Sequence, residues 1–181
     1  MRHLLVLIAA LMATTAIATP ITWVGTDAVV LENVKPIDAK KYRTVYDAWN
    51  MLCFDLRDVD CTGVSVPKVM TFSPNPARPG LAGYYKGGDV IYVRNNLGKN
   101  ALEEVLAHEM SHYMDVIKFN LPVPGPALEI CFSEKRAWAV SDNYNRMYGK
   151  KSRIVGETWV NWYAHCTPYR DVLYPKVNEA N

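Results

Sequence analysis

The stretch Asn100-Ala-Leu-Glu-Glu-Val-Leu-Ala-His-Glu-Met-Ser-His-Tyr-Met-Asp-Val-Ile-Lys118 decides the fold that we expect for this chain. Leu102, Val105 and Leu106 recur at helical spacing, and Asn100 is a residue type that favours the N-cap position. The pattern predicts a helix over about 100–118.

Within this helix the five residues His108-Glu-Met-Ser-His112 form a His-Glu-x-x-His motif. Residues at i and i+4 share one helical face, so both imidazoles can reach a single Zn²⁺ ion. Glu109 would lie beside the water that such an ion activates, where a carboxylate acts as general base and then general acid. The composition of the chain alone produces this motif in only about 0.3% of shuffled sequences.

A catalytic zinc site normally has three protein ligands, so a later element must supply the third. A second helix is expected from near Ala127 to Tyr148, because the proline-rich segment 120–126 forces a change of direction and Gly149 favours a helix end. Glu134 is the preferred ligand, since Ala137 one turn later would let the two helices approach closely. Glu129, Asp115 and a ligand from outside the chain remain alternatives.

The rest of the chain predicts an α+β fold in which a small antiparallel or mixed sheet packs on the helix that carries the motif and on the following helix. A helix is expected over 38–58, with its apolar side chains on one face, namely Tyr42, Val45, Trp49, Leu52 and Leu56. Three short β-prone runs follow at 66–73, 81–85 and 89–94, separated by prolines and glycines, and they predict a small antiparallel meander. The run 89–94 is the expected edge that holds an extended substrate, with an interior strand as the equal alternative.

The first residues resemble an export signal. Arg2 and His3 precede an apolar run, and Ala16-Ile-Ala18 places small residues where signal peptidase requires them. We expect residues 1–18 to be removed and 19–181 to form a single domain, secreted or periplasmic; an uncleaved N-terminal anchor is the alternative. The net charge of +2 gives no broad positive electrostatic field that would attract nucleic acid, so we expect no nucleic-acid partner. We expect a monomer that binds a peptide or protein substrate and that does not insert stably into a membrane.

The four cysteines form an even set, which an exported protein can oxidise. Three pairings are open, and we favour Cys53 with Cys61 and Cys131 with Cys166. A zinc knot is the weaker interpretation, since the chain lacks a Cys-x-x-Cys pair.

The sequence also offers candidates for two roles that support a zinc site: orienting a ligand histidine and stabilising the oxyanion. Asp115, one turn after His112, could accept a hydrogen bond from a ligand imidazole, and a solvent-exposed helix charge is the equal alternative. Stabilising the developing oxyanion requires a hydrogen-bond donor. His165 ranks first for this catalytic role because no other histidine of the mature chain lies outside the motif. Tyr163 and Tyr144 are the alternatives.

The β-prone segment, the helix with His-Glu-Met-Ser-His and the following helix with Glu134-Lys-Arg-Ala137 together resemble the gluzincin class of zinc metallopeptidases, in a small form. The resemblance covers about residues 66–148. It implies a zincin-like fold, one zinc ion per chain bound by His108, His112 and Glu134, and Glu109 as catalytic base. The expected function is hydrolysis of peptide bonds. A zinc amidase acting on cell-wall peptide crosslinks and a catalytically silent zincin-fold binding protein are the alternatives.

Overall fold

The structure is a computed structural model, and it describes residues 31–55, 60–121, 127–150, 158–163 and 165–175. It contains a four-stranded mixed sheet and a set of helices, so the expected α+β class is confirmed. The expected signal peptide, residues 1–18, lies outside the described residues. None of the helices in the described ranges is long and apolar enough to cross a membrane.

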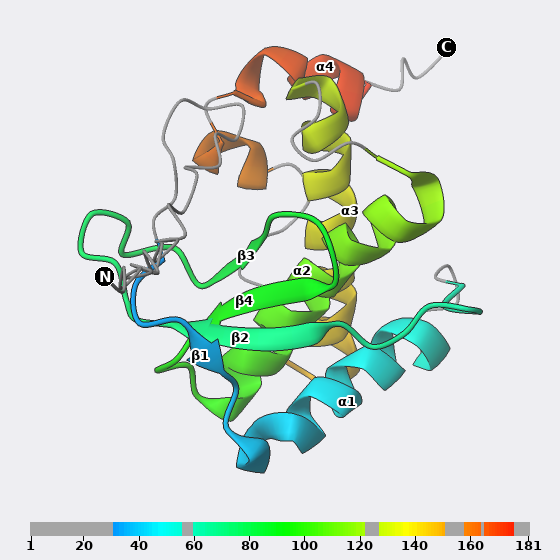
Figure 1. The fold of residues 1–181 in the computed structure, drawn as a ribbon. Helices are drawn as coiled ribbons and strands as arrows, with labels where there is room; N and C mark the ends of the chain where they lie inside the picture. The colour runs from blue at the N-terminus through cyan, green and yellow to red at the C-terminus, as the bar shows by residue number, and fades with distance from the viewer. Residues whose placement is uncertain (1–30, 56–59, 122–126, 151–157, 164, 176–181) are drawn as a thin grey trace, which may run out of the picture.

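The sheet has the strand order β1-β2-β4-β3 (Figure 1). Its strands are β1 (Lys35–Pro36), β2 (Lys68–Phe72), β4 (Val90–Arg94) and β3 (Gly83–Tyr85). β3 pairs antiparallel with β4, whereas β2 pairs parallel with β4 from Lys68 opposite Val90. The expected antiparallel meander is therefore wrong. Alternation of apolar residues reveals strands but not their order, and the connection between β2 and β3 returns the chain to the far side of β4.

This strand order also decides between the two alternatives for the run 89–94. β4, which covers most of the predicted run 89–94, lies between β2 and β3 and is an interior strand. Its Ile91 and Val93 are fully buried in the main core. β3 is the edge strand on the side of the predicted site.

The first helical segment comprises a short 3-10 turn (Ala39–Lys41), α1 (Tyr42–Asn50) and a final π-helical turn, Met51–Asp55. Val45, Trp49 and Leu52 are buried as predicted, but Tyr42 is 47% exposed and does not join the core. Leu56 lies outside the described residues. The main core fills the space between the sheet and the helices α1 and α2.

The two site helices have nearly the predicted bounds. α2 (Lys99–Phe119) begins after Gly98 rather than after Asn100, and it ends at Asn120 in the left-handed conformation with φ 50°. α3 (Ala127–Met147) is followed by Gly149 with φ +63°, which confirms the predicted glycine stop. α3 packs along α2, and Ala137 at their contact is fully buried.

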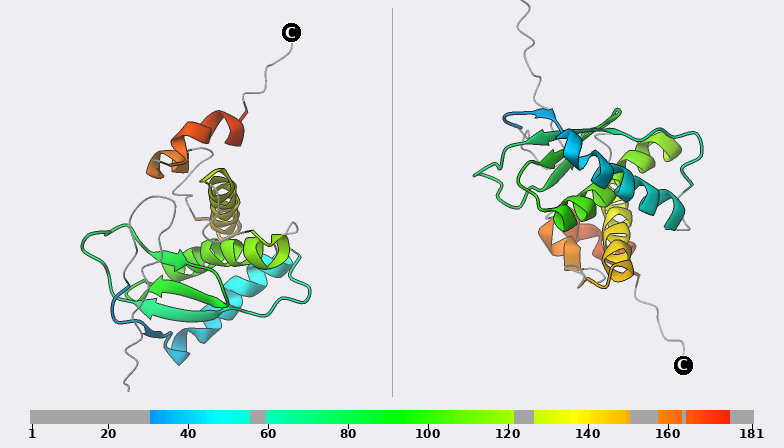
Figure 2. Two further views of the ribbon diagram at one scale, coloured as in Figure 1. Left: turned by 45° about the horizontal axis from the view of Figure 1, so that its top comes forward. Right: turned by 90° about the horizontal axis from the view of Figure 1, so that it is seen from below.

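The C-terminal elements are two 3-10 turns, η3 (Thr158–Trp162) and η4 (Thr167–Tyr169), and α4 (Arg170–Leu173). They lie beside α3, on the opposite side of the molecule from α1 (Figures 1 and 2). A second small core joins them to α3 through Cys131, Trp159, Val160, Cys166 and Leu173. Both favoured disulfides are confirmed, Cys53–Cys61 and Cys131–Cys166.

Candidate metal centre

The side chains of His108, His112 and Glu134 meet between α2 and α3. The two Nε2 atoms are 3.2 Å apart. His108 Nε2 lies 3.5 Å from Glu134 Oε2, and His112 Nε2 lies 3.5 Å from Glu134 Oε1. One ligand atom from each residue falls within 4.8 Å of the others, so the three residues form a group that could hold a metal ion. The antiparallel return predicted from the proline-rich turn brings Glu134 to the two histidines.

Hydrogen bonds fix which nitrogen of His112 carries its proton. Nδ1 lies 2.8 Å from the hydroxyl of Ser133, and this hydroxyl donates to Asp115 Oδ2 at 2.6 Å. Because Ser133 has a single proton and gives it to the carboxylate, it can only accept from His112. Nδ1 is therefore the protonated nitrogen of the neutral ring, and Nε2 turns a bare lone pair towards Glu134 and His108.

Asp115 supports the site indirectly. It is buried, and besides the Ser133 hydroxyl it accepts a hydrogen bond of 2.8 Å from Arg136 Nε. The direct bond from a ligand imidazole that the sequence suggested is replaced by one through Ser133. Both Asp115 oxygens are engaged there, and Glu129 is exposed in the first turn of α3, so neither alternative third ligand lies in the group.

His108 is held by the next turns of α3. Its Nδ1 lies 3.4 Å from Ser141 Oγ, and its ring packs against Trp138 with 4.4 Å between ring centroids. Ser133, Trp138 and Ser141 were not predicted. Trp138 and Ser141 lie four and seven residues after Glu134 on the same helical face, so listing that face of the predicted helix would have found these two; Ser133 directly precedes Glu134 and lies about 100° away around the helix.

The charges of the group are set by burial and by proximity. Burial lowers the pKa of His112 to about 4, although the negative charge of Glu134 acts to raise it. Burial alone would raise the pKa of Glu134, but the neighbouring His112 and His108 outweigh it and the pKa is lowered. Burial alone would lower the pKa of His108, but its hydrogen bond and charge interaction with Glu134, together with the charges of Glu109 and Glu104, outweigh burial and the pKa is raised. When no metal ion is bound, these two shifts favour a protonated His108 beside an ionised Glu134.

Glu109 lies beside the group and is almost fully buried. Burial raises the pKa of its carboxyl group to about 8. The backbone of edge strand β3 passes directly over it: a Cβ built on Gly83 would lie 2.6 Å from Val105 Cγ1 and closer still to Glu109 Oε1. Glycine at position 83 is therefore what lets the strand and this carboxylate approach.

A cavity of about 440 Å³ opens beside these residues. Its walls include His108 and Glu109 on one side, the segment 79–83 leading into β3 on another, and Tyr163 from the C-terminal elements. Burial, and then the charges of Glu134 and Glu109, raise the pKa of Tyr163 well above its ordinary value, and its hydrogen bond with Glu134 acts in the same direction. The phenol therefore keeps its proton and can donate it in a hydrogen bond.

The chain matches no protein-family model, no curated protein and no solved structure. Its interpretation rests on the geometry of the residues themselves.

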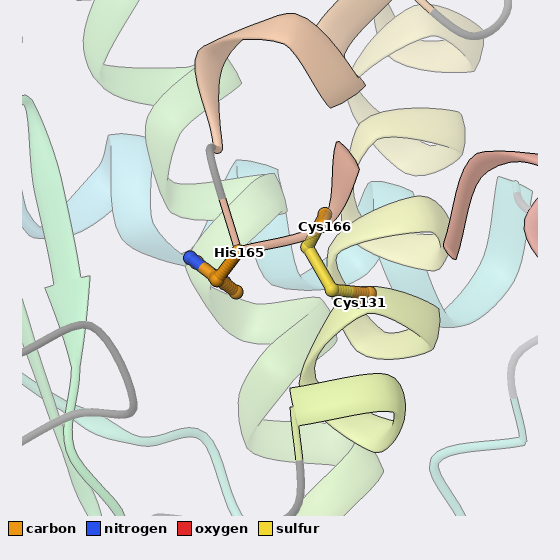
Figure 3. A group of neighbouring side chains, drawn as sticks. All are labelled: Cys131, His165 and Cys166. Carbon is orange, nitrogen blue, oxygen red and sulfur yellow. A yellow bond between two sulfur atoms is a disulfide. The ribbon is translucent and has the colours of Figure 1, made fainter. Parts of the chain in front are cut away.

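The other two candidates for an oxyanion donor are not among the residues that line this cavity, although the ring centroids of His165 and Tyr163 are 5.8 Å apart. His165 packs against the Cys131–Cys166 disulfide, where the C-terminal segment meets α3 (Figure 3), and it is not among the residues that line the cavity. Tyr144 donates to Glu103 and accepts from Lys150 Nζ at 2.7 Å, in a separate cavity beside α1. Of the three, Tyr163 is the residue that the fold brings to the metal-ligand group.

Proposed function

We propose that this protein is a secreted zinc-dependent peptidase of the zincin type, with His108, His112 and Glu134 as zinc ligands and Glu109 as general base. The observation that carries the proposal is the convergence of three ligand atoms beside a buried carboxylate at the wall of a cavity. A binding protein would have no need for that carboxylate, whose burial costs free energy.

The spacing of the ligand atoms favours zinc. Two ligands that each lie about 2.05 Å from a tetrahedral ion are separated by about 3.3 Å. The two Nε2 atoms are 3.2 Å apart, close to this value, and each lies 3.5 Å from a different oxygen of Glu134. Two imidazoles and a carboxylate are also a ligand set that catalytic zinc sites use, with the fourth position left for water or substrate. A bound zinc ion would supply Lewis-acid activation of that water and of the scissile carbonyl.

Glu109 performs the proton transfers in this proposal: its pKa of about 8 belongs to the metal-free site, and a bound zinc ion would lower it and so favour the ionised carboxylate that acts as the base. It takes one proton from the attacking water as the water oxygen bonds to the carbonyl carbon, and it delivers that proton to the amide nitrogen as the C–N bond breaks. Burial beside Gly83 keeps the carboxylate out of bulk water and fixes its direction.

Tyr163 is the proposed donor to the oxyanion. Its pKa is raised by burial and by two neighbouring carboxylates, so the hydroxyl is neutral and carries a proton to donate. A donor fixed in a site that excludes water stabilises developing negative charge more strongly than water does. This assignment replaces His165, which the sequence ranked first.

The cleft is suited to an extended peptide. Within the described ranges, β3 pairs on one side with β4, so its outer edge is available for main-chain hydrogen bonds to a substrate. Beyond Glu109 the cavity is walled by apolar side chains, among them Leu97, Ala101 and Val105. We expect an apolar substrate side chain next to the scissile bond to enter it.

The proposed export is consistent with the two disulfides, which are compatible with an extracellular location. Removal of residues 1–18 as a signal peptide remains a prediction, and N-terminal sequencing of the exported protein tests it.

The decisive experiment incubates the zinc-loaded protein, residues 19–181, with a mixed peptide library, with and without a chelator. Glu109→Gln is compared with Glu129→Gln, a matched change on the exposed first turn of α3. We expect cleavage that the chelator abolishes, loss of several orders of magnitude in Glu109→Gln with zinc retained, and no loss in Glu129→Gln.

Two results would reject the peptidase assignment. Equal activity of Glu109→Gln and wild type would exclude the proposed base. Stoichiometric zinc without cleavage of any library peptide would favour the amidase, tested on cell-wall crosslinked peptides, or the binding protein if those also remain intact.

A further inference from the structure

We propose that the Cys131–Cys166 disulfide is a clamp that holds Tyr163 over the metal-ligand group, so that peptidase activity depends on this one disulfide being formed. The proposal rests on the proposed function, because Tyr163 is the residue that it positions. It assigns to the disulfide a role in the reaction as well as in stability.

The positions of the two cysteines carry the argument. Cys131 lies one helical turn before Glu134 on α3, and Cys166 lies three residues after Tyr163. The covalent link therefore joins the helix that supplies a ligand to the segment that supplies the phenol, within one turn of each. Figure 3 shows the disulfide at the point where this segment meets α3.

The segment has a small core of its own. Trp159, Val160 and Leu173 are fully buried around the disulfide, and this cluster is separate from the main core between the sheet and α2. Besides this packing, Lys135 Nζ donates to the carbonyl of Leu173 at 2.5 Å. A core of this size gives few contacts per residue, so such a segment opens more readily than the main core unless it is cross-linked.

Opening the disulfide is a two-electron reduction. A dithiol reductant gives two electrons and two protons to the two sulfurs and becomes a disulfide itself, leaving two thiols at positions 131 and 166. Both cysteines are fully buried, so the segment must move away from α3 before a reductant reaches them. That movement also carries Tyr163 away from Glu134.

The chain offers a matched control. Cys53–Cys61 spans 8 residues near the end of α1 and packs against the main core, and neither cysteine contributes to the metal-ligand group or to the cavity wall. Removing it tests the general cost of losing a disulfide in this protein.

The experiment compares the clamp variant Cys131→Ala/Cys166→Ala with the control variant Cys53→Ala/Cys61→Ala. Each double variant is made once with Tyr163 and once with the additional change Tyr163→Phe, and all four proteins are loaded with zinc. We expect loss of the clamp to lower kcat about 10²-fold with KM nearly unchanged, the size of effect seen when one oxyanion donor is lost. In the Tyr163→Phe background the same loss is expected to change kcat less than about 3-fold, because the two changes act through one hydroxyl.

Hydrogen exchange gives a readout that needs no activity. In the clamp variant the amides of 158–163 and 165–173 are expected to lose protection while those of α2 and α3 keep it. Three results would each overturn the proposal. They are unchanged hydrogen-exchange protection of the segment in the clamp variant, additive losses of kcat from the clamp change and Tyr163→Phe, and an equal loss of kcat in the Cys53→Ala/Cys61→Ala control. A wild-type protein that binds no zinc and cleaves no peptide would instead overturn the proposed function, and the exchange data would still decide whether the disulfide holds the segment.

Discussion

Gly83 lies so close to the carboxylate of Glu109 that a methyl group on its Cα would overlap with Glu109 Oε1. The Cβ would also meet Val105 Cγ1 at 2.6 Å and Glu109 Cγ at 2.7 Å, so turning the end of the Glu109 side chain relieves only part of the overlap and β3 has to shift as well. We therefore expect Gly83→Ala to lower kcat about 10²-fold, as a displacement of about 1 Å in a reacting group does.

The control for this change is Gly80→Ala. A Cβ at Gly80 meets nothing within 4 Å, although this glycine also lines the cavity. Steady-state kinetics of the two variants would show a loss in the first and near wild-type kcat in the second. Equal rates for all three proteins would mean that Glu109 is not positioned by the edge strand.

Ser133→Ala removes the partner of His112 Nδ1 and also one partner of Asp115. Loss of such an outer partner typically weakens metal affinity 10- to 100-fold, because the ring is no longer held in the right tautomer and direction. We expect a fall of about 10-fold or more in zinc affinity, measured by competition with a chelator. Ser65→Ala, at an exposed serine before β2, serves as the control and should leave the affinity unchanged.

Metal binding should stabilise the fold. The ligands come from two different helices and meet only in the folded chain, so zinc binds the native state preferentially. At a free zinc concentration of about 100 times Kd the added stability is about 2.7 kcal/mol. For a domain of this size that corresponds to a rise in Tm of about 5–10 °C. Glu134→Ala should reduce the shift in thermal denaturation, and an unchanged shift would place zinc elsewhere.

Ala101→Phe should narrow the apolar part of the cavity. Ala101 lines the wall on the side of α2 that leads away from the ligands. We expect KM to rise for substrates with a large apolar side chain beside the scissile bond and to change little for those with alanine there, since a pocket discriminates by about 1–3 kcal/mol per methylene. Ala139→Phe, at an exposed position of α3, is the matched control, and peptide-library profiling is the measurement.

Much of the local structure could be predicted from the sequence because it depends on neighbouring residues. Helical spacing placed α2 and α3, a glycine with positive φ marked the end of α3, and the motif brought His108 and His112 to one face. Glu134 followed from the return of the chain and the small Ala137. Each of these inferences involves contacts within a helix or between two consecutive helices.

Contacts between distant segments could not be predicted in the same way. Sequence alternation cannot tell which strand pairs with which, so the sequence leaves the run 89–94 as either an edge or an interior strand, and β4 is interior. His165 was preferred for its rarity, whereas the direction in which the C-terminal segment crosses α3 decides that Tyr163 reaches the cavity and His165 meets a disulfide. That direction depends on tertiary packing, which the local pattern does not record.

α3 alone supplies a ligand and the partners of both histidines, through residues 133, 134, 138 and 141. Inserting one residue between positions 134 and 138 would rotate Trp138 and Ser141 by about 100° about the helix axis relative to Ser133 and Glu134. The set could then no longer contact both histidines at once, while each amino acid of the set stayed the same. An engineer wishing to transplant the centre would therefore have to move α2 and α3 as a pair, in their present register.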